Sequence, residues 1–341
     1  MRSEQFYQGH LDAVSRSFAL CIPQLAVPFR QHVALSYLLL RVLDTVEDAS
    51  FADKLHQQRQ FAAFRQFLAK RPTLAQVDAF RDSFPDSITD GERNLLADTE
   101  AFFEDAYELP AAPRGVMFGA IDRMAVGMAA YARRPTLRLV DLEDVSRYCC
   151  IVAGLVGEML TQLWGLDGET PPRMIHAYRF GLFLQKVNIL KDQVEDEAVG
   201  RFLVPDRRDI LASLRADAEG ALSYLTSLPQ KERGYRTFCA WSLMLGAASL
   251  VQMDGPRQSH RVETMQLLAR TAGISQDDQA LRRQFAELLP RLPHVRAKEP
   301  LPKPEPADWF VRTLNAPLSE RELIDLGAIA AVSRQPAAAH Q

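Results

Sequence analysis

Apolar residues recur at intervals of three and four positions along most of this 341-residue chain, and long period-two alternation of β-branched residues is missing from it. The observed spacing aligns side chains on one face of an α-helix, so the pattern indicates an all-α protein. Prolines between the periodic segments mark loops, because proline lacks the backbone donor that a helix needs. Helices are predicted over residues 30–49, 55–70, 93–106, 113–132, 139–165, 173–197, 207–227, 231–253, 259–272 and 275–290.

The composition, with 47% hydrophobic and 24% charged residues, is that of an ordinary globular domain. The proline-marked loops are short, so residues 1–296 are predicted to form a single helical domain. Segment 297–308 is rich in proline and charge, which favours an extended connection. Residues 297–341 are therefore predicted to be a C-terminal tail, with one short helix around 318–332.

Charge and cysteine content exclude several classes of protein. A formal charge of −3 gives no basic field, so a nucleic-acid partner is not expected. The four cysteines fit no metal-binding spacing and are expected to be reduced. No cationic, apolar leader precedes Phe6, and no run reaches the roughly 18 apolar residues of a membrane span. We therefore expect a cytoplasmic protein without a transmembrane anchor, and leave peripheral membrane contact open.

Two acidic motifs of the form Asp-x-Val-Glu-Asp end strongly apolar segments, one at residues 44–48 and one at 192–196. Three- and four-residue spacing on a helix brings the carboxylates of each motif to one face, where they repel each other. Mg²⁺ relieves such repulsion, since it prefers oxygen ligands and is commonly shared between carboxylates and substrate phosphates. A single acidic triplet would ordinarily be a solvated helix end. The matched pair favours a Mg²⁺-diphosphate site.

Neighbouring residues support this interpretation of the motifs. Arg41 lies near the first, and Asn188, Lys191 and Arg201 flank the second. The dinucleotide-binding, P-loop, zinc-protease and nucleophile-elbow signatures are all missing from the sequence, which argues against kinase and protease chemistry.

Several separated segments resemble the squalene and phytoene synthase family, and the match extends over most of residues 14–265. The Thr-Val-Glu core of the first motif favours the squalene-forming branch. The matching segments are SRSF (15–18), YLLLRVLDTVED (37–48), YCCIVAGLVG (148–157), GLFLQKVNILKD (181–192), Gly200-Arg201, Pro205 and FCA (238–240).

The resemblance implies a class I isoprenoid (terpenoid) synthase fold, with antiparallel helices around a central active-site cavity. It implies a farnesyl-diphosphate farnesyltransferase that joins two farnesyl diphosphate molecules, or similar allylic diphosphates, head to head. The product would be presqualene diphosphate, followed by NADPH-dependent reduction to squalene.

Two alternatives are kept. A synthase of the same fold would stop at presqualene diphosphate or form a non-reduced product of the phytoene or dehydrosqualene type. A non-catalytic scaffold on the same fold is the second alternative, since fold does not dictate function. Ser242-Leu243 stand where the family commonly has Pro-Gln, which leaves the reduction step open.

The resemblance also assigns roles to individual residues. Tyr148, Arg41 and Tyr37 are the expected catalytic residues. The expected Mg²⁺ ligands and their supporting residues are Asp44, Glu47, Asp48, Asn188, Asp192, Glu195 and Asp196. The diphosphate would be bound by Arg16, Arg41, Lys191, Arg201 and Gln185. The prenyl pocket would include Phe18, Val152, Gly154, Gly157, Leu184 and Phe238. NADPH would contact Asn188, Arg257, His260 and Arg261.

Overall fold

The structure is a computed structural model that describes residues 1–15, 17–134, 136–168, 170–252 and 261–288, with the side chains of residues 251, 252 and 261 left out of the description. The expected tail at 297–341, with its short helix, lies outside the described residues.

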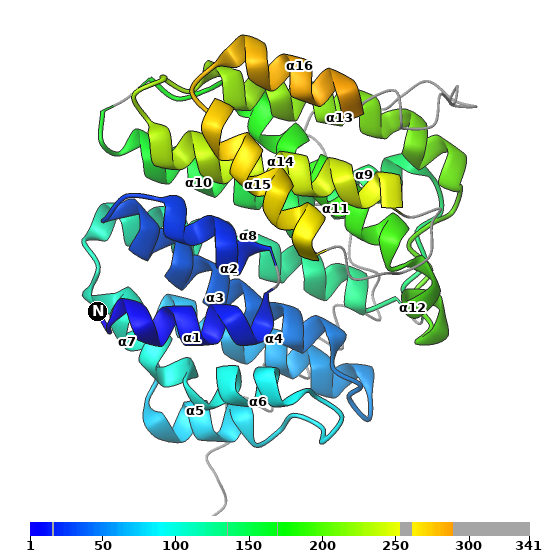
Figure 1. Cartoon of the computed structure of the whole chain (residues 1–341). Helices are drawn as coiled ribbons and strands as arrows, with labels where there is room; N and C mark the ends of the chain where they lie inside the picture. The colour runs from blue at the N-terminus through cyan, green and yellow to red at the C-terminus, as the bar shows by residue number, and fades with distance from the viewer. Residues whose placement is uncertain (16, 135, 169, 253–260, 289–341) are drawn as a thin grey trace, which may run out of the picture.

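Helices make up most of the described chain (Figure 1). An isolated parallel bridge joins Arg138 to Phe202 in the loops that precede α9 and α13. The all-α prediction is confirmed. In chain order the helices are α1 (Glu4–Val14), α2 (Phe18–Cys21), the 3₁₀ turn η1 (Ile22–Gln24), α3 (Phe29–Asp48), α4 (Lys54–Ala69), α5 (Leu74–Arg81), α6 (Asp90–Ala97), α7 (Thr99–Glu108), α8 (Ala111–Ala132), α9 (Leu142–Cys149), the π-helical turn η2 (Cys150–Gly154), α10 (Leu155–Gly165), α11 (Met174–Lys191), α12 (Gln193–Ala198), α13 (Arg207–Ser227), α14 (Arg233–Gln252), α15 (Arg261–Ile274) and α16 (Asp278–Leu288).

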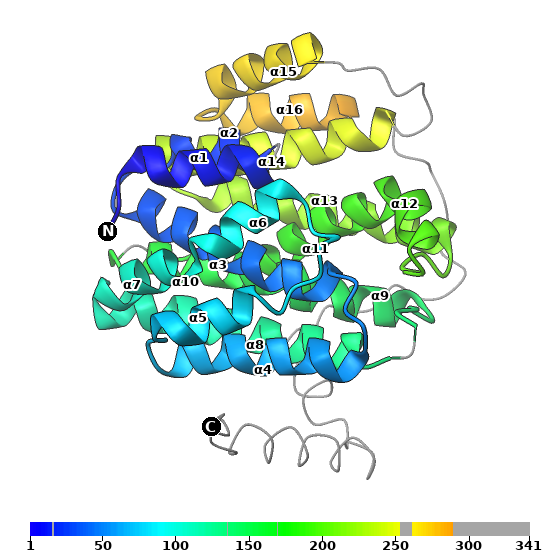
Figure 2. The same cartoon turned by 90° about the horizontal axis from the view of Figure 1, so that it is seen from below.

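Helices α3 and α11 form the centre of the molecule. Helix α3 contacts α1, α4, α6, α7, α8 and α10, while α11 contacts α9, α10, α13 and α14. Figure 2 shows α15 and α16 on the opposite side of the molecule from α4. Because α3 is surrounded, it is apolar around most of its circumference, and Leu35, Leu38, Val42 and Val46 are fully buried. Only its last turn carries acids.

Most predicted helices agree with the structure to within a few residues, but three were missed and two are divided. Helices α1, α2 and α5 were not predicted. Thr73 and Gln76 form a capping box at the start of α5, a pattern visible in the sequence. The predicted helices 93–106 and 173–197 are each interrupted, at Asp98 and Asp192, where the backbone leaves helical geometry.

Two glycines allow α10 and α11 to approach at backbone distance. A Cβ added to Gly157 would lie 2.3 Å from the carbonyl oxygen of Ala177, and one added to Gly181 would lie 2.3 Å from that of Ala153. No larger residue fits without separating the helices. Gly157 was expected to make room for a prenyl chain, and the structure gives it this packing role as well.

One helical stretch, Leu142–Gly165, is long and apolar enough to cross a membrane by length and composition, which the sequence reading did not anticipate. Within its most apolar window, 61% of the residues are buried inside the protein, as in the core helix of a globular domain.

Candidate active site

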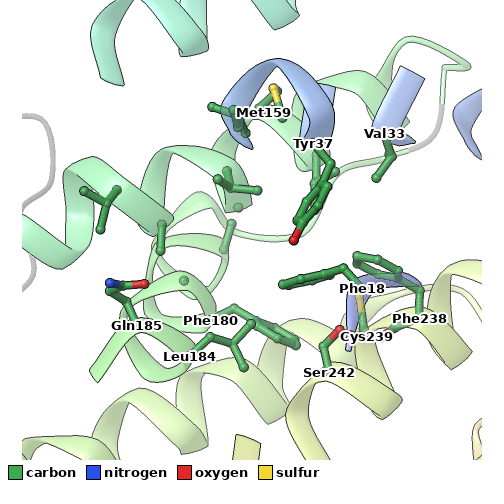
Figure 3. A pocket seen from close by; sticks show the side chains of 18 of the residues that line it. Phe18, Val33, Tyr37, Met159, Phe180, Leu184, Gln185, Phe238, Cys239 and Ser242 are labelled. Carbon is green, nitrogen blue, oxygen red and sulfur yellow. Dashed lines mark hydrogen bonds between the residues drawn. The ribbon is translucent and has the colours of Figure 1, made fainter. Parts of the chain in front are cut away.

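A cavity of about 260 Å³ lies between α3, α10, α11 and α14 (Figure 3). Most of its wall is apolar. Polar side chains gather where α3 and α11 approach their C-terminal ends, and they are Arg41, Asp44, Gln185 and Asn188. The remaining lining residues are Phe18, Ile22, Val33, Tyr37, Leu40, Met124, Val152, Ala153, Val156, Gly157, Met159, Leu160, Ala177, Phe180, Gly181, Leu184, Tyr224, Tyr235, Phe238, Cys239 and Ser242.

A second, polar cleft of about 830 Å³ is lined by acids of both motifs. Glu47 and Asp48 come from the end of α3, and Glu195 and Asp196 from the first turn of α12. Asp44, one turn earlier on α3, faces the apolar cavity instead. The first motif therefore contributes to both spaces, as expected for residues that bind the charged end of a mostly apolar molecule.

Arg201 joins the two motifs. Its Nη1 donates a hydrogen bond to Asp48, and its Nε lies 3.8 Å from Oδ1 of Asp196. Its Nη2 donates to the Tyr148 hydroxyl at 3.3 Å and lies 3.9 Å from Glu47. Gly200, with a positive φ of 80°, makes the turn that directs the chain into this position.

The clustered carboxylates have raised pKa values. Burial raises the pKa of Glu47 to about 7, and the negative charge of Asp44 adds to this effect against the attraction of Arg201. Burial also raises the pKa of Asp196 to about 6, with Asp192 and Glu195 contributing. The pKa of Asp44 is raised by burial as well. Arg201 and Arg41 together do not balance these acids, so additional positive charge would stabilise their ionised forms.

The donor set fits Mg²⁺, because it consists of carboxylate and amide oxygens. Among the described residues, however, no three His, Cys, Asp or Glu side chains are grouped closely enough to form a complete cage. Any one ion would therefore be held by one or two carboxylates and would take its other ligands from water or a phosphate, as Mg²⁺ commonly does.

Tyr148, an expected catalytic residue, lies beneath the first motif and is not among the residues that line the apolar cavity. Its side chain is 1% exposed, and its hydroxyl donates to Glu47 at 3.3 Å. The ring packs edge-on against Tyr131. The Tyr148 hydroxyl thus contacts both Glu47 and Arg201.

The other predicted residues are divided between the cavity and other places. Arg41 donates to Asp44 at 3.0 Å, and the Tyr37 ring lies 5.4 Å from that of Phe18. Of the pocket predictions, Phe18, Val152, Gly157, Leu184 and Phe238 line the cavity.

Three predicted residues lie elsewhere. Gly154 is not in the lining, because a Cβ there would meet the ring of Tyr178 at 3.1 Å and the glycine serves helix packing. Lys191 and Asp192 lie 3.5 Å apart, each with a side chain 47% exposed, outside the lining of both spaces. Arg16, Arg257, His260 and the side chain of Arg261 are outside the described residues.

Gln57 was missed by the sequence reading. Its Nε2 donates to the carbonyl oxygens of Val46 at 3.0 Å and Glu47 at 2.9 Å. These carbonyls belong to the last turn of α3, which has no helical partners of its own. Gln57 therefore fixes the end of the helix that carries the first motif. A glutamine on a helix gives no sequence signal for such a contact. Tyr224 and Tyr235 in the cavity wall were missed for the same reason.

The chain is similar in sequence to known proteins. A family model for squalene/phytoene synthase matches residues 11–264. The squalene synthase of Schizosaccharomyces pombe is 30% identical over 273 residues, covering 70% of this chain and 57% of the relative. That of Eremothecium gossypii is 31% identical over 279 residues, covering 72% and 61%. The chain thus spans about three fifths of the length of these curated relatives.

Solved structures establish the fold. A complex of TcSQS with a ligand matches with a TM-score of 0.70 at 24% identity, covering 91% of this chain and 96% of the other. A dehydrosqualene synthase in complex with a ligand matches with a TM-score of 0.52 at 18% identity, covering 79% and 95%. The predicted class of fold, helices around a central cavity, is confirmed.

Proposed function

The chain belongs to the squalene/phytoene synthase family, and from this premise we propose that it is a farnesyl-diphosphate farnesyltransferase that condenses two farnesyl diphosphate molecules head to head. The observation that carries the proposal is the pair of acidic motifs at the polar end of an apolar cavity. An allylic diphosphate has the matching form, with a long apolar chain and a highly charged head. A scaffold would have no use for so many poorly neutralised carboxylates.

The acidic residues would hold Mg²⁺, and the basic residues would hold the diphosphate. We assign Asp44, Asp48, Asp192 and Asp196 as metal ligands, with Glu47, Glu195 and Asn188 in support. When bound, Mg²⁺ would neutralise charge that develops on the departing diphosphate.

Two arginines are the strongest diphosphate candidates. The Nε atoms of Arg41 and Arg201 are buried without a hydrogen-bond partner among the described residues, and diphosphate oxygens would satisfy them. Gln185 borders the same end of the cavity. Lys191, on the half-exposed rim, would add only longer-range attraction.

Loss of one diphosphate leaves an allylic cation, which the double bond of the second substrate attacks before loss of a proton closes the cyclopropane. The apolar wall keeps water from capturing the cation. The Tyr148 hydroxyl, held between Glu47 and Arg201, keeps these two groups in position. Released diphosphate is the base we favour for the final proton.

We further propose that NADPH reduces presqualene diphosphate to squalene in the same cavity. Asn188 and the α14 face with Phe238, Cys239 and Ser242 border the space where a hydride would be delivered. Arg257 and His260, two of the other expected NADPH contacts, lie outside the described residues. The rival product is presqualene diphosphate or a non-reduced hydrocarbon.

The test uses the purified chain with farnesyl diphosphate, Mg²⁺ and NADPH labelled at the transferred hydrogen. We expect labelled squalene with NADPH and presqualene diphosphate without it. Diphosphate release without label in any C30 hydrocarbon would assign the chain to the non-reducing synthases. Failure to release diphosphate above the level of Asp48→Asn would contradict the transferase assignment.

We propose a cytoplasmic enzyme without a nucleic-acid partner, based on composition and charge. Fractionation of cells that express the full chain tests this, and recovery in the membrane pellet after a salt wash would contradict it.

A further inference from the structure

The apolar cavity has an end that lies far from the acidic motifs. Val33 and Asp44 both line it and are eleven residues apart on α3, which corresponds to about 16 Å of helix. Figure 3 shows Val33 and Phe238 on the opposite side of the pocket from Gln185. Tyr235, one turn before Phe238 on α14, continues the wall at this distal end.

Three hydroxyl groups form a buried chain behind the distal wall. The Tyr235 and Tyr224 hydroxyl oxygens are 2.6 Å apart, and the Tyr224 oxygen is 2.8 Å from Oγ1 of Thr161. Thr161 donates at 2.7 Å to the carbonyl oxygen of Gly157. All these distances are normal for O–H···O bonds, and the three side chains are buried.

The hydrogen bonds of this hydroxyl chain can be donated in only one direction. The Gly157 carbonyl can only accept, so it uses the single proton of Thr161. Thr161 must then accept from Tyr224, and Tyr224 must accept from Tyr235. Burial raises the pKa of both tyrosines, so neither ionises near neutral pH and every bond persists. Directed chains of this kind strengthen one another.

The hydroxyl chain and neighbouring rings hold the Tyr235 ring in place, and these contacts come from several helices. Its partners Tyr224 and Thr161 belong to α13 and α10. Behind the ring lie Phe29, with ring centroids 5.0 Å apart, and Trp164, at 6.0 Å. To admit a longer molecule, the ring would have to break its bond to Tyr224 and displace these two rings. Tyr235 is therefore a stiff part of the distal wall.

We propose that Tyr235, held by the Tyr224–Thr161 chain, limits the prenyl length that the cavity accepts, so that C15 allylic diphosphates are used in preference to C20. This inference rests on the proposed function. Pockets reject a surplus group only when their wall cannot yield, and discrimination per added methylene is about 10-fold to 200-fold in a stiff site. Each isoprene unit adds a larger group than a methylene.

The experiment compares kcat/KM for farnesyl and geranylgeranyl diphosphate. We expect Tyr235→Ala to shift the ratio at least about tenfold toward the C20 substrate. Tyr235→Phe keeps the ring but breaks the chain, so its shift should be a few-fold and in the same direction. Tyr235→Leu replaces the alanine variant if that variant does not fold. Tyr107→Ala is the control, because this tyrosine also has a hydrogen-bonded hydroxyl, which donates to the Phe67 carbonyl oxygen, but it lies outside the cavity.

The outcomes separate this inference from the proposed function. An unchanged ratio in a Tyr235→Ala or Tyr235→Leu variant that still consumes farnesyl diphosphate would overturn the inference alone. If the wild-type chain releases no diphosphate, the proposed function fails, and the wall is tested by binding. The ligands are then farnesyl and geranylgeranyl S-thiolodiphosphate, and binding is measured as the rise in melting temperature. The C20 analogue should give the larger rise only in the alanine or leucine variant, and equal preferences in variant and wild type would overturn the inference.

Discussion

Arg201 carries the only guanidinium that the described residues place between the two acidic motifs, and its charge is not enough for them. It reaches Asp48, Asp196 and Glu47 within 4 Å, yet the pKa of Glu47 stays at about 7. Burial outweighs the attraction of a single cation there. At the residue scale, the cluster is therefore built for more positive charge than the chain itself supplies.

Asp48→Asn should nearly abolish turnover while helical circular dichroism is unchanged, because an amide cannot replace a carboxylate as a metal ligand. The Asp48 side chain is 45% exposed, so the fold depends little on its charge. Asp53→Asn is the matched control. Asp53 lines the same cleft and caps α4, a role that asparagine also performs. Equal loss of turnover in both variants would point to general charge loss instead of a ligand role for Asp48.

Sequence could identify the acids but not the contacts that organise them. The Asp-x-Val-Glu-Asp motif and the apolar segment before it are local patterns, so the sequence placed Asp44 and Asp48 at the correct end of the helix. The bonds from Arg201 to Asp48 and from Gln57 to α3 join residues far apart in the chain or on different helices. They depend on how the helices pack, which no local pattern encodes.

At the scale of elements, the end of α3 is fixed by α4. Gln57→Ala should raise the Mg²⁺ concentration needed for half-maximal activity several-fold, because the turn that carries Glu47 and Asp48 loses two carbonyl partners. Gln58→Ala is the control, since Gln58 donates to the Ala129 carbonyl at 3.0 Å, away from the motif. Both variants should lose about 1 kcal/mol of stability. An equal Mg²⁺ requirement in the two would contradict a positioning role for Gln57.

Helix α9, which carries Tyr148, is attached to the end of α8 through Asp144. Its carboxylate accepts from Arg134 at 2.8 and 3.1 Å and from Tyr131 at 2.9 Å. Burial alone would raise the pKa of Asp144, but the bonds from Arg134 and Tyr131 outweigh it, and the pKa lies below its ordinary value. The folded state therefore favours the ionised carboxylate, whose contribution to stability is present above pH 3.8 and is lost as the pH falls through the folded-state pKa.

Asp144→Asn should accordingly lower the stability by about 2 kcal/mol at pH 7, where the hydrogen bonds to a charged group are lost. The difference in melting temperature between wild type and variant should shrink as the pH is lowered below 3.8. Thermal unfolding measured from pH 7 to pH 3 checks this. A difference that is constant with pH would mean that the carboxylate charge does not contribute.

Element boundaries were less predictable than the elements themselves. Periodicity gave 207–227 for α13 and 30–49 for α3, close to the observed ends. It merged α11 with α12, because Asp192 interrupts the helix without a proline or glycine to mark the break. It also missed α5, whose capping box was a usable signal.

For the whole molecule, α14 connects the cavity to the C-terminal helices. One face of it carries Tyr235, Phe238 and Ser242 into the cavity. The adjacent residue, Arg236, is 0% exposed and faces the other way, toward α15 and α16. The sequence predicted these helices but not their order in space. The burial of an arginine can be predicted only when the carbonyl groups that accept its hydrogen bonds are known.

Arg236→Met should destabilise the whole protein by about 3–5 kcal/mol, because a buried charge-assisted network loses its centre. Arg236 donates to the carbonyl oxygens of Ser275 at 2.8 Å, Leu225 at 3.2 Å and Leu228 at 2.6 Å, and it pairs with Asp278. Methionine fills similar volume but leaves these carbonyls buried without a donor.

Urea denaturation and hydrogen exchange together check the Arg236 prediction. The loss should appear first as faster exchange of α16 amides, since Ser275 precedes that helix and Asp278 is its first residue. Arg236→Lys should recover only part of the lost stability, because a single ammonium cannot reproduce the planar guanidinium fork. Arg233→Met, at an exposed position on the same helix, should change the free energy of unfolding by less than about 0.5 kcal/mol. If Arg236→Met unfolds at the same urea concentration as Arg233→Met, then α14 does not hold the C-terminal helices through this residue, and the connection between cavity and C-terminal helices must depend on apolar packing alone.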